Sequence, residues 1–325
     1  MPDHATTFSR RRAMGMGAAA LLAPGAAFAS AGLETIHGAA FGTTWRVTGP
    51  AGSGLEALRR PVDQLLAGID RRMSPWRSDS EVGRFNSSHA GGHAISDDTA
   101  TVTAAALRVA EESGGCFDPT FGPAVSHWGF GPITGGGATG WRGLALSGGR
   151  LTKAWSDLTF DPCGIAKGWA LDRLADLAQA AGHADLLLDL GGELAAVGHH
   201  PSGRPWQVAI EDPRPARTGL AAALTFEAGA VATSGLRAQS YALDGRTYGH
   251  IIDPTTGEPV QGRLLSVTVL ARSAMEADAW ATALFAAGDA EGPALARRRG
   301  LRAVFLFDDN GLRQETTGGA DHALL

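Results

Sequence analysis

The stretch DPCGIAKG at residues 161–168 marks a sharp turn from an extended segment into a helix. Leu158–Phe160, directly before it, is typical of the end of a strand. After it, apolar residues recur at helical spacing, at Leu171, Leu174, Leu177 and Ala181. Such a turn directs free N–H groups and the positive end of a helix at an anion, and Lys167 adds a full positive charge. The sequence therefore predicts an anion site here, with an ordinary strand-to-helix connection as the alternative.

A second stretch, SAMEADAWAT at residues 273–282, predicts another helix. Ser273 and Glu276 have the spacing of a capping box, so the helix is expected to run from Ala274 to about Gly288. Asp278 and Thr282 are four residues apart and share one helical face. Apolar residues share that face: Ala281 and Phe285. The face is therefore expected to point into the protein.

A carboxylate on an inward face needs a cation. Carboxylate and hydroxyl oxygens suit magnesium or calcium, whereas zinc favours Cys or His ligands. The Gly164 carbonyl, which has no side chain over it, can approach a metal closely. The two stretches together predict a magnesium-assisted phosphate site; a partly buried Asp278 paired with an arginine is the alternative.

Eight short stretches occur along the chain in a fixed order: Gly42–Val47; Met73–Trp76 with Arg84–Asn86; Phe117–Thr120 with Trp128–Gly131; Asp161–Gly168; Asp189–Glu193; Thr233–Gly235; His250–Pro254 with Thr256–Gly257; and the helix of Asp278 and Thr282. In these motifs, over about residues 38–310, the chain resembles the ApbE family of FAD:protein FMN transferases. Each motif is weak by itself, but eight in the family order are specific. The resemblance implies a single bilobed, T-fold-related catalytic domain over residues 30–325, with mixed sheets and flanking helices.

The resemblance also implies a reaction in which FAD is a substrate. FAD is cleaved at its pyrophosphate, AMP is released, and FMN is joined through its phosphate to a Thr or Ser hydroxyl of an acceptor flavoprotein. The family pattern places Mg²⁺ on three positions: Asp278, Thr282 and the main-chain oxygen of Gly164. It places FAD on ten: Phe41, Trp76, Cys116, Phe117, Asp118, Asp161, Lys167, His250, Ile251 and Ile252.

The chemistry accounts for these residue types. His250 is the expected general base, because an imidazole with a pKa near 6.5 suits removal of a hydroxyl proton. Lys167 is the expected stabiliser of negative charge in the transition state. Phe41, Trp76 and Phe117 are expected to stack on the isoalloxazine or adenine rings, with packing in the core as the alternative.

Two other functions remain open at this point. The same residues would support magnesium-dependent hydrolysis of FAD to FMN and AMP, with water as the acceptor. A non-enzymatic periplasmic flavin binder is the third reading, but simple binding does not require a metal beside a base. The acceptor itself is not specified by the sequence; a flavoprotein of a respiratory electron-transfer complex is expected only by analogy.

The N-terminus predicts export. Ser9–Arg12 carries three arginines, an apolar stretch follows over residues 13–28, and Ala27–Ala29 has the A-x-A form of a cleavage site. We therefore expect residues 1–29 to be a twin-arginine signal peptide. The apolar stretch is short for a membrane span, and no cysteine near the cleavage site provides a lipid anchor. The expected location is the periplasm, where Cys116 and Cys163 would be free thiols or a disulfide.

Composition limits the remaining choices. The chain has 325 residues, and 44% of them are hydrophobic. This length and this hydrophobic share are sufficient to form the core of one large folded unit. Its net charge of -5 argues against a nucleic-acid partner. Helices are expected over residues 55–69 and 98–112, and strands over 186–190, 207–210, 222–226 and 264–270. Because the two kinds of element do not alternate regularly, the α+β class is favoured over a doubly wound sheet.

Overall fold

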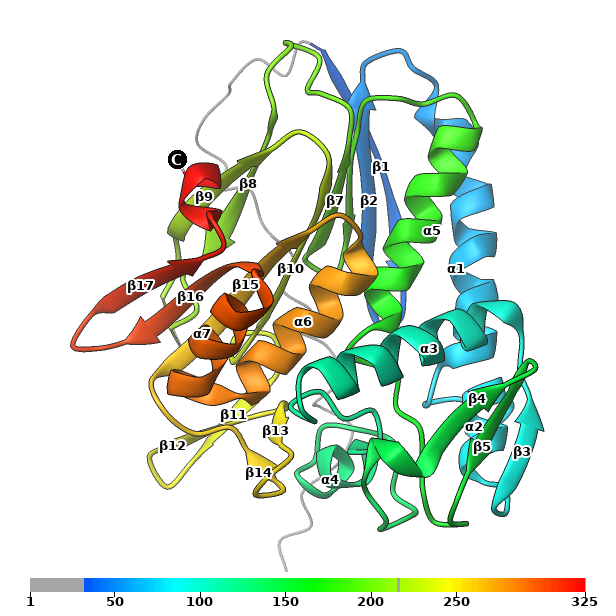
Figure 1. Ribbon diagram of the computed structural model, residues 1–325. Helices are drawn as coiled ribbons and strands as arrows, with labels where there is room; N and C mark the ends of the chain where they lie inside the picture. Colours follow the sequence, from blue (N-terminus) through cyan, green and yellow to red (C-terminus); the bar gives the residue numbers. More distant parts are fainter. Residues whose placement is uncertain (1–31, 215–216, 325) are drawn as a thin grey trace, which may run out of the picture.

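The computed structural model describes residues 32–214 and 217–324, and the predicted signal peptide lies outside them. The fold is built on an eight-stranded sheet with the strand order β1-β2-β6-β7-β10-β15-β16-β17 (Figure 1). Its strands are β1 Leu33–Ala40, β2 Thr43–Pro50, β6 Leu186–Leu190, β7 Glu193–Val197, β10 Gly229–Gly235, β15 Leu264–Ala271, β16 Arg302–Asp308 and β17 Leu312–Thr317. The α+β class is confirmed. The sheets, expected to be mixed, are antiparallel in every pairing of the described strands, because hairpins join several neighbours.

Helices and small sheets surround the large sheet. The helices are η1 Leu55–Leu58, α1 Arg59–Met73, α2 Glu81–Asn86, α3 Asp97–Glu112, α4 Gly122–His127, η2 Trp141–Gly143, α5 Ala166–Ala180, α6 Ala274–Ala286, α7 Gly288–Arg299 and η3 Ala320–Ala323. The small sheets are β3 Gly91–Ala94 with β5 Arg150–Lys153 and β4 Leu144–Ser147, β8 Trp206–Glu211 with β9 Leu220–Phe226, β11 Ser240–Leu243 with β12 Arg246–Gly249, and β13 Ile252–Asp253 with β14 Glu258–Pro259. None of the helices in these residues has the length and apolar composition needed to cross a membrane.

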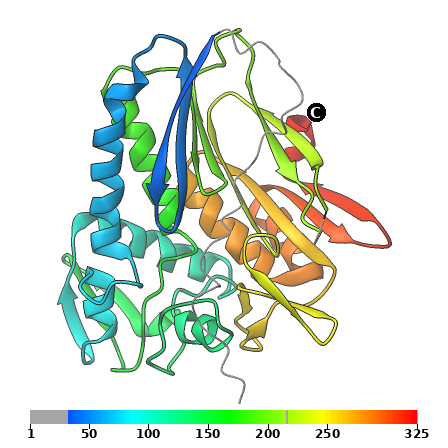
Figure 2. The same cartoon turned by 180° about the vertical axis from the view of Figure 1, so that it is seen from behind.

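The large sheet is buried on both faces. Successive side chains of β16 point to opposite faces of the sheet. One face of the strand packs into the core that includes α6, through Ala303, Phe305 and Phe307. The other packs into a second apolar cluster with β8, β9 and η3, through Val304 and Leu306. Helices α5, α6 and α7 lie in front of the sheet in Figure 1, and Figure 2 shows the β8–β9 hairpin from the other side. The sheet is therefore the middle layer, and α5 and α6 are held against it.

Most predicted elements are present, and one is wrong. The helices expected over residues 55–69, 98–112 and 274–288 correspond to η1 with α1, α3 and α6, and the four expected strands correspond to β6, β8, β9 and β15. Leu158–Phe160 is not a strand. Side chains, rather than a neighbouring strand, hydrogen-bond its backbone. Asn86 donates from Nδ2 to the Phe160 carbonyl and accepts the Phe160 N–H at Oδ1. Lys153 Nζ donates to the Leu158 carbonyl.

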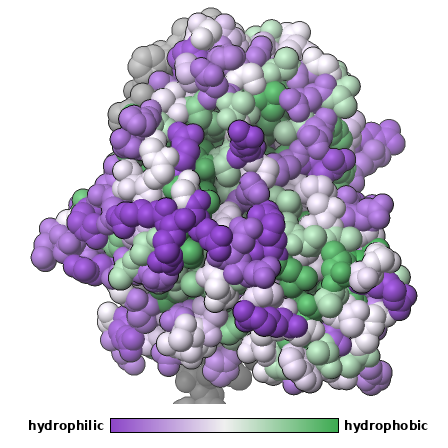
Figure 3. Space-filling model, viewed as in Figure 1, coloured by the Kyte–Doolittle hydropathy of each residue, from purple (hydrophilic) through white to green (hydrophobic). Residues whose placement is uncertain are grey.

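The three arginines at the end of α7 do not form a free basic patch. Arg297 pairs with Glu315, Arg298 pairs with Glu291, and Arg299 donates to the Glu112 carbonyl. Figure 3, in the view of Figure 1, shows a band of hydrophilic side chains across the part of this face where α7 lies, with hydrophobic patches elsewhere. The run is a solvated helix end whose positive charges suit the negative end of the helix dipole.

Gly168 sets the distance between α5 and α6. A Cβ on this residue would lie 2.2 Å from the Ala274 carbonyl oxygen, which is main chain and cannot move aside cheaply. We expect Gly168→Ala to lower the free energy of unfolding by about 2–4 kcal/mol, measured by urea denaturation. Gly135→Ala is the matched control, because nothing lies within 4 Å of a Cβ there. Equal stability of the two variants would contradict this close packing.

Candidate functional site

Lys167, Glu193 and Asp278 form a charged cluster where the first turn of α5 meets α6 and β7. Lys167 Nζ pairs with Glu193 Oε1, and Asp278 Oδ2 accepts the Gly168 N–H over 3.1 Å. Glu193 is 3% exposed and Asp278 is 5% exposed. The inward orientation predicted for Asp278 is confirmed. Its hydrogen-bond donor is the Gly168 N–H at the start of α5, and the Glu193 carboxyl and the Lys167 charge lie beside it, in place of an arginine.

The three groups determine one another's protonation. Burial, together with the charge of Asp278, raises the pKa of Glu193 to about 8 although Lys167 lowers it. Burial also raises the pKa of Asp278. Burial alone would lower the pKa of Lys167, but the two carboxylates more than offset it and raise that pKa. Lys167 is therefore held as a cation beside two acids that share less than two full negative charges near neutral pH.

Gly164 on the turn and Thr282 on α6 lie close together. A Cβ on Gly164 would lie 3.2 Å from Thr282 Oγ1 and 3.2 Å from Phe117 Cε2. Thr282 Oγ1 is also 3.3 Å from Ser234 Oγ on β10. The turn at residues 161–168 and the helix of Asp278 thus converge, although they are far apart in the sequence.

The motif of Phe117 and Asp118 lies against the same turn. The Asp161 N–H donates to the Pro119 carbonyl over 2.7 Å, and Asp161 Oδ1 accepts the Cys163 N–H over 3.0 Å. Asp118 Oδ1 accepts from Thr120, and its Oδ2 accepts the Trp141 N–H. Burial raises the pKa of both Asp161 and Asp118. In this structure Asp118 therefore fixes its own loop.

His250 follows β12 and is oriented by a main-chain contact. Its Nδ1 lies 3.2 Å from the Gln239 carbonyl oxygen, and its own N–H donates to that oxygen over 3.3 Å. A carbonyl oxygen only accepts, so Nδ1 carries the proton and Nε2 keeps a free lone pair. Burial, and then the charge of Lys167, lowers the pKa of His250 although Gln239 opposes the shift. The imidazole is therefore neutral near pH 7, as a general base must be.

The other predicted residues differ in their exposure. Ile251 and Ile252 are buried, and Phe117 is 4% exposed, so its ring belongs to the core. Trp76 is 58% exposed and free to stack on a ligand. Phe41 lies in the β1–β2 turn with a φ of 52°, which is rare for an aromatic residue and marks a strained position. None of these observations tests contact with FAD, which stays a prediction.

Both cysteines are free thiols. Cys116 is partly buried, and burial raises its pKa. Cys163 lies beside Asp161, and burial followed by that carboxylate raises its pKa well above the usual range. Of the two alternatives for Cys116 and Cys163, the structure has free thiols.

Glu193 and Ser234 were not predicted as site residues, although both lie in motifs that the sequence analysis names. An acid directly after Gly191-Gly192 and before an apolar strand was the available signal for Glu193. Its Oε2 is buried and has no hydrogen-bond partner among the described residues. Such an orphaned acceptor is costly unless a cation or a proton satisfies it.

We expect Glu193→Gln to change how the stability of the metal-free protein depends on pH. The folded-state pKa of about 8 exceeds the ordinary glutamate value of 4.5. The stability that Glu193 contributes is therefore complete below pH 4.5 and is lost as pH rises to about 8. Glutamine cannot ionise, so the variant should be more stable than the parent at pH 8 by on the order of 1 kcal/mol or more.

The measurement is urea unfolding in EDTA at pH 5, 6.5 and 8. Glu227→Gln is the matched control, because the Glu227 side chain is 70% exposed. Parallel pH curves for parent and Glu193→Gln would show that Glu193 ionises normally in the folded protein.

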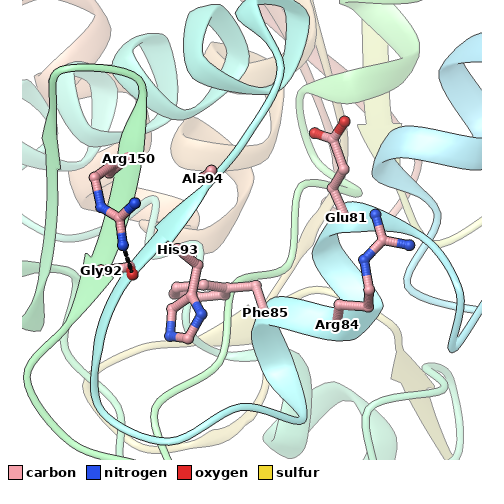
Figure 4. Close-up of a pocket in the computed structure, with 7 residues that line it drawn as sticks. All are labelled: Glu81, Arg84, Phe85, Gly92, His93, Ala94 and Arg150. Atoms are coloured by element: carbon pink, nitrogen blue, oxygen red, sulfur yellow. Dashed lines mark hydrogen bonds between the residues drawn. The ribbon is translucent and has the colours of Figure 1, made fainter.

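A separate hollow of about 320 Å³ lies beside α2 and β3 (Figure 4). Its lining residues are Glu81, Arg84, Phe85, Gly92, His93, Ala94 and Arg150. The charged groups there hold local structure: Glu81 Oε2 accepts from Ser96 and Thr99 at the start of α3, and Arg150 donates to the Gly92 carbonyl. No predicted site residue lines this hollow.

Over residues 32–214 and 217–324, no group of three or more His, Cys, Asp or Glu side chains converges on a metal position. The predicted ligand set is of another kind, with one carboxylate, one hydroxyl and one main-chain carbonyl. Two features suit a hard cation there: Gly164 and Thr282 lie close together, and Glu193 Oε2, in the cluster with Asp278, has no hydrogen-bond partner among the described residues. The residues present therefore fit Mg²⁺.

The chain is similar to known proteins over most of its length. The chain is 34% identical over 302 residues to an FAD:protein FMN transferase of Vibrio cholerae, covering 86% of this chain and 90% of that protein. It is 34% identical over 325 residues to an FAD:protein FMN transferase of Salmonella typhimurium, covering 92% and 93%.

Solved structures agree with the sequence relatives. The flavin transferase ApbE from Vibrio cholerae superimposes with a TM-score of 0.82 at 33% identity, covering 90% of this chain and 99% of that chain. The apo flavinyl transferase ApbE from Pseudomonas stutzeri gives a TM-score of 0.80 at 34% identity, covering 90% and 96%. The family model described as "ApbE family" matches residues 41–305. Because this model covers most of the chain and the named relatives are 34% identical over 86% and 92% of it, this chain belongs to the ApbE family.

Proposed function

We propose that this protein transfers FMN from FAD to a Thr or Ser hydroxyl of an acceptor flavoprotein and releases AMP. The observation that carries the proposal is the cluster of Lys167, Glu193 and Asp278 at the start of α5, with a neutral His250 near Lys167. The cluster combines a fixed cation, acids suited to a metal and a base. The relatives named FAD:protein FMN transferase support the same reaction.

Mg²⁺ would be held by Asp278, Thr282 and the Gly164 carbonyl. When bound, it would neutralise charge on the pyrophosphate oxygens and lower the repulsion that an incoming hydroxyl meets. Asp278 is already fixed for this role by the Gly168 N–H. The Ser234 hydroxyl, 3.3 Å from Thr282 Oγ1, orients the second oxygen ligand.

The chain's own residues account for the remaining steps. His250 Nε2 accepts the proton of the acceptor hydroxyl, whose oxygen then forms a bond to the phosphorus of the FMN half. The bond between this phosphorus and the bridging oxygen breaks, and its electron pair leaves with AMP. Lys167 lies beside the charge that develops on the phosphoryl oxygens and stabilises it.

The acceptor would be met outside the cytoplasm. Arginines at residues 10–12, the apolar stretch and Ala27–Ala29 support export by the twin-arginine pathway. We therefore propose a periplasmic enzyme whose acceptor is a secreted or membrane-attached flavoprotein, such as one in respiratory electron transfer. Blocking the pathway should leave the unprocessed chain in the cytoplasm; export that continues would contradict this location.

The test is the intact mass of an acceptor domain incubated with the mature protein, FAD and Mg²⁺. A gain of one FMN, lost with EDTA and lost when the acceptor Thr is replaced by Ala, is the expected result. An unmodified acceptor with accumulating AMP and free FMN would identify an FAD pyrophosphatase instead. Retained FAD without turnover would identify a flavin binder.

A further inference from the structure

The β11–β12 hairpin stands apart from the large sheet, and one of its edges is open. Its two strands pair only with each other among the described strands, and Figures 1 and 2 show the hairpin projecting from the body of the protein. All four residues of β11, Ser-Tyr-Ala-Leu, are exposed. Natural edges are usually protected by charges, prolines or bulges, but β11 carries neither a charge nor a proline. The edge of β11 is therefore available to another strand.

The register shows which groups the edge offers. Leu243 pairs with Arg246 across a two-residue turn, Asp244-Gly245, in which both φ angles are positive. In such a turn the flanking pair exchanges the inner hydrogen bonds. By the antiparallel alternation, Ala242 and Ser240 then direct their N–H and C=O groups outward. An added strand would hydrogen-bond to these outward N–H donors and C=O acceptors.

A row of aromatic rings joins this edge to His250. Trp128 stacks on Tyr248 with ring centres 5.6 Å apart, Tyr248 on Tyr241 at 5.4 Å, and Tyr241 on Phe130 at 5.4 Å; the Phe130 ring lies 6.2 Å from His250. Trp128 Nε1 also donates to the Gly257 carbonyl, which ties the row to the β13–β14 turn. The rings hold the hairpin at a fixed orientation relative to the imidazole.

The base of the hairpin is His250 itself. The Gln239 carbonyl, one residue before β11, accepts from both the backbone N–H and Nδ1 of His250. A segment paired with β11 would therefore have a defined register relative to His250 Nε2.

We propose that the edge of β11 binds an extended segment of the acceptor flavoprotein as an added strand and so presents its Thr or Ser hydroxyl to His250. The proposal rests on the proposed transferase function. Glu193 and Asp278 are 3% and 5% exposed, so an extended segment can approach them more closely than a folded domain can. Strand addition supplies affinity through main-chain hydrogen bonds. Tyr241 and Leu243, two residues apart, share one face and provide apolar contact beside them.

The test compares two hairpin variants with a distant control. Ala242→Pro removes an outward N–H and leaves the inner ladder of the hairpin intact, since proline is tolerated on edges. Leu243→Asp adds a charge to the apolar face of the edge at a side chain that is 56% exposed. Leu220→Asp on β9, 68% exposed, is the matched control. Steady-state transfer to the acceptor domain gives the KM for the acceptor, and a binding titration gives the FAD affinity.

We expect the KM for the acceptor to rise about tenfold or more in both hairpin variants, while their FAD affinity stays within about twofold of the parent. In the Leu220→Asp control, both the KM for the acceptor and the FAD affinity should stay within about twofold of the parent. In the parent, the acceptor should protect the Ser240 and Ala242 amides from hydrogen exchange. Unchanged KM values together with unprotected amides would overturn strand addition while leaving transfer by the parent intact. Protection that appears without acceptor and grows with protein concentration would assign the edge to a second copy of this chain and would also overturn the proposal. A parent that transfers no FMN would overturn the proposed function itself.

Discussion

Replacing His250 by alanine is expected to lower the rate of FMN transfer by about 10²–10⁴-fold while FAD affinity changes little. The Gln239 carbonyl fixes the imidazole with its protonated nitrogen turned to the main chain, which leaves Nε2 as the acceptor of the hydroxyl proton. Alanine removes this base without disturbing the Lys167 cluster. The measurement is acceptor mass over time at saturating FAD, with FAD affinity determined separately.

The pH profile gives an independent check of the same role. Burial and Lys167 lower the pKa of His250 below its usual 6.5, so Nε2 stays unprotonated to lower pH than in a free histidine. The parent should therefore keep its activity as pH falls from 8 to 6.5 and lose it only below that range. In His250→Ala this acid limb should disappear, and added imidazole should restore part of the activity.

His322→Ala is the matched control, because its side chain is 85% exposed near the end of the chain. It should transfer FMN at the parent rate. Near-normal transfer by His250→Ala would remove His250 from the mechanism. A loss of FAD affinity equal to the loss of rate would instead assign it to substrate binding.

The site elements that depend on local sequence were predicted well. Ser273 Oγ accepts the Glu276 N–H over 3.2 Å, so Ser273 caps α6 at the position that the spacing indicated, while the Glu276 carboxylate pairs with Arg108. Once the helix is known, its period places Asp278 on the inward face. The same reasoning located the start of α5 near Lys167. In both cases the information lies within a few residues, which is the range that capping and periodicity report.

The predictions that failed or were missed depend on contacts between distant residues. Leu158–Phe160 has a strand-like composition, but Asn86, 74 residues from Phe160, takes its hydrogen bonds. Glu193 joins the site through Lys167, 26 residues away, and through Asp278 on another helix. A sequence pattern shows which groups are polar but not which partner each one finds.

Asp278→Asn should abolish the response to magnesium while the fold is retained. Asparagine has nearly the same shape, and its Oδ1 can still accept the Gly168 N–H that Asp278 accepts now over 3.1 Å. The variant lacks the charge that would hold the cation, and Lys167 loses one of the two carboxylates that raise its pKa. We expect transfer to fall by about 10²–10³-fold at a magnesium concentration that saturates the parent.

The decisive readout is separate from activity. Magnesium should raise the thermal midpoint of the parent in a concentration-dependent way, because a ligand that binds only the folded state stabilises it. Asp278→Asn should show no such rise. Asp176 is an exposed acid on α5, so Asp176→Asn should behave as the parent does.

If Asp278→Asn were stabilised by magnesium as strongly as the parent, the cation would have to be held elsewhere, and the unpartnered Glu193 Oε2 would be the next group to replace. If neither protein responded, Asp278 would act through Lys167 and the Gly168 N–H alone, and EDTA would leave transfer by the parent unchanged.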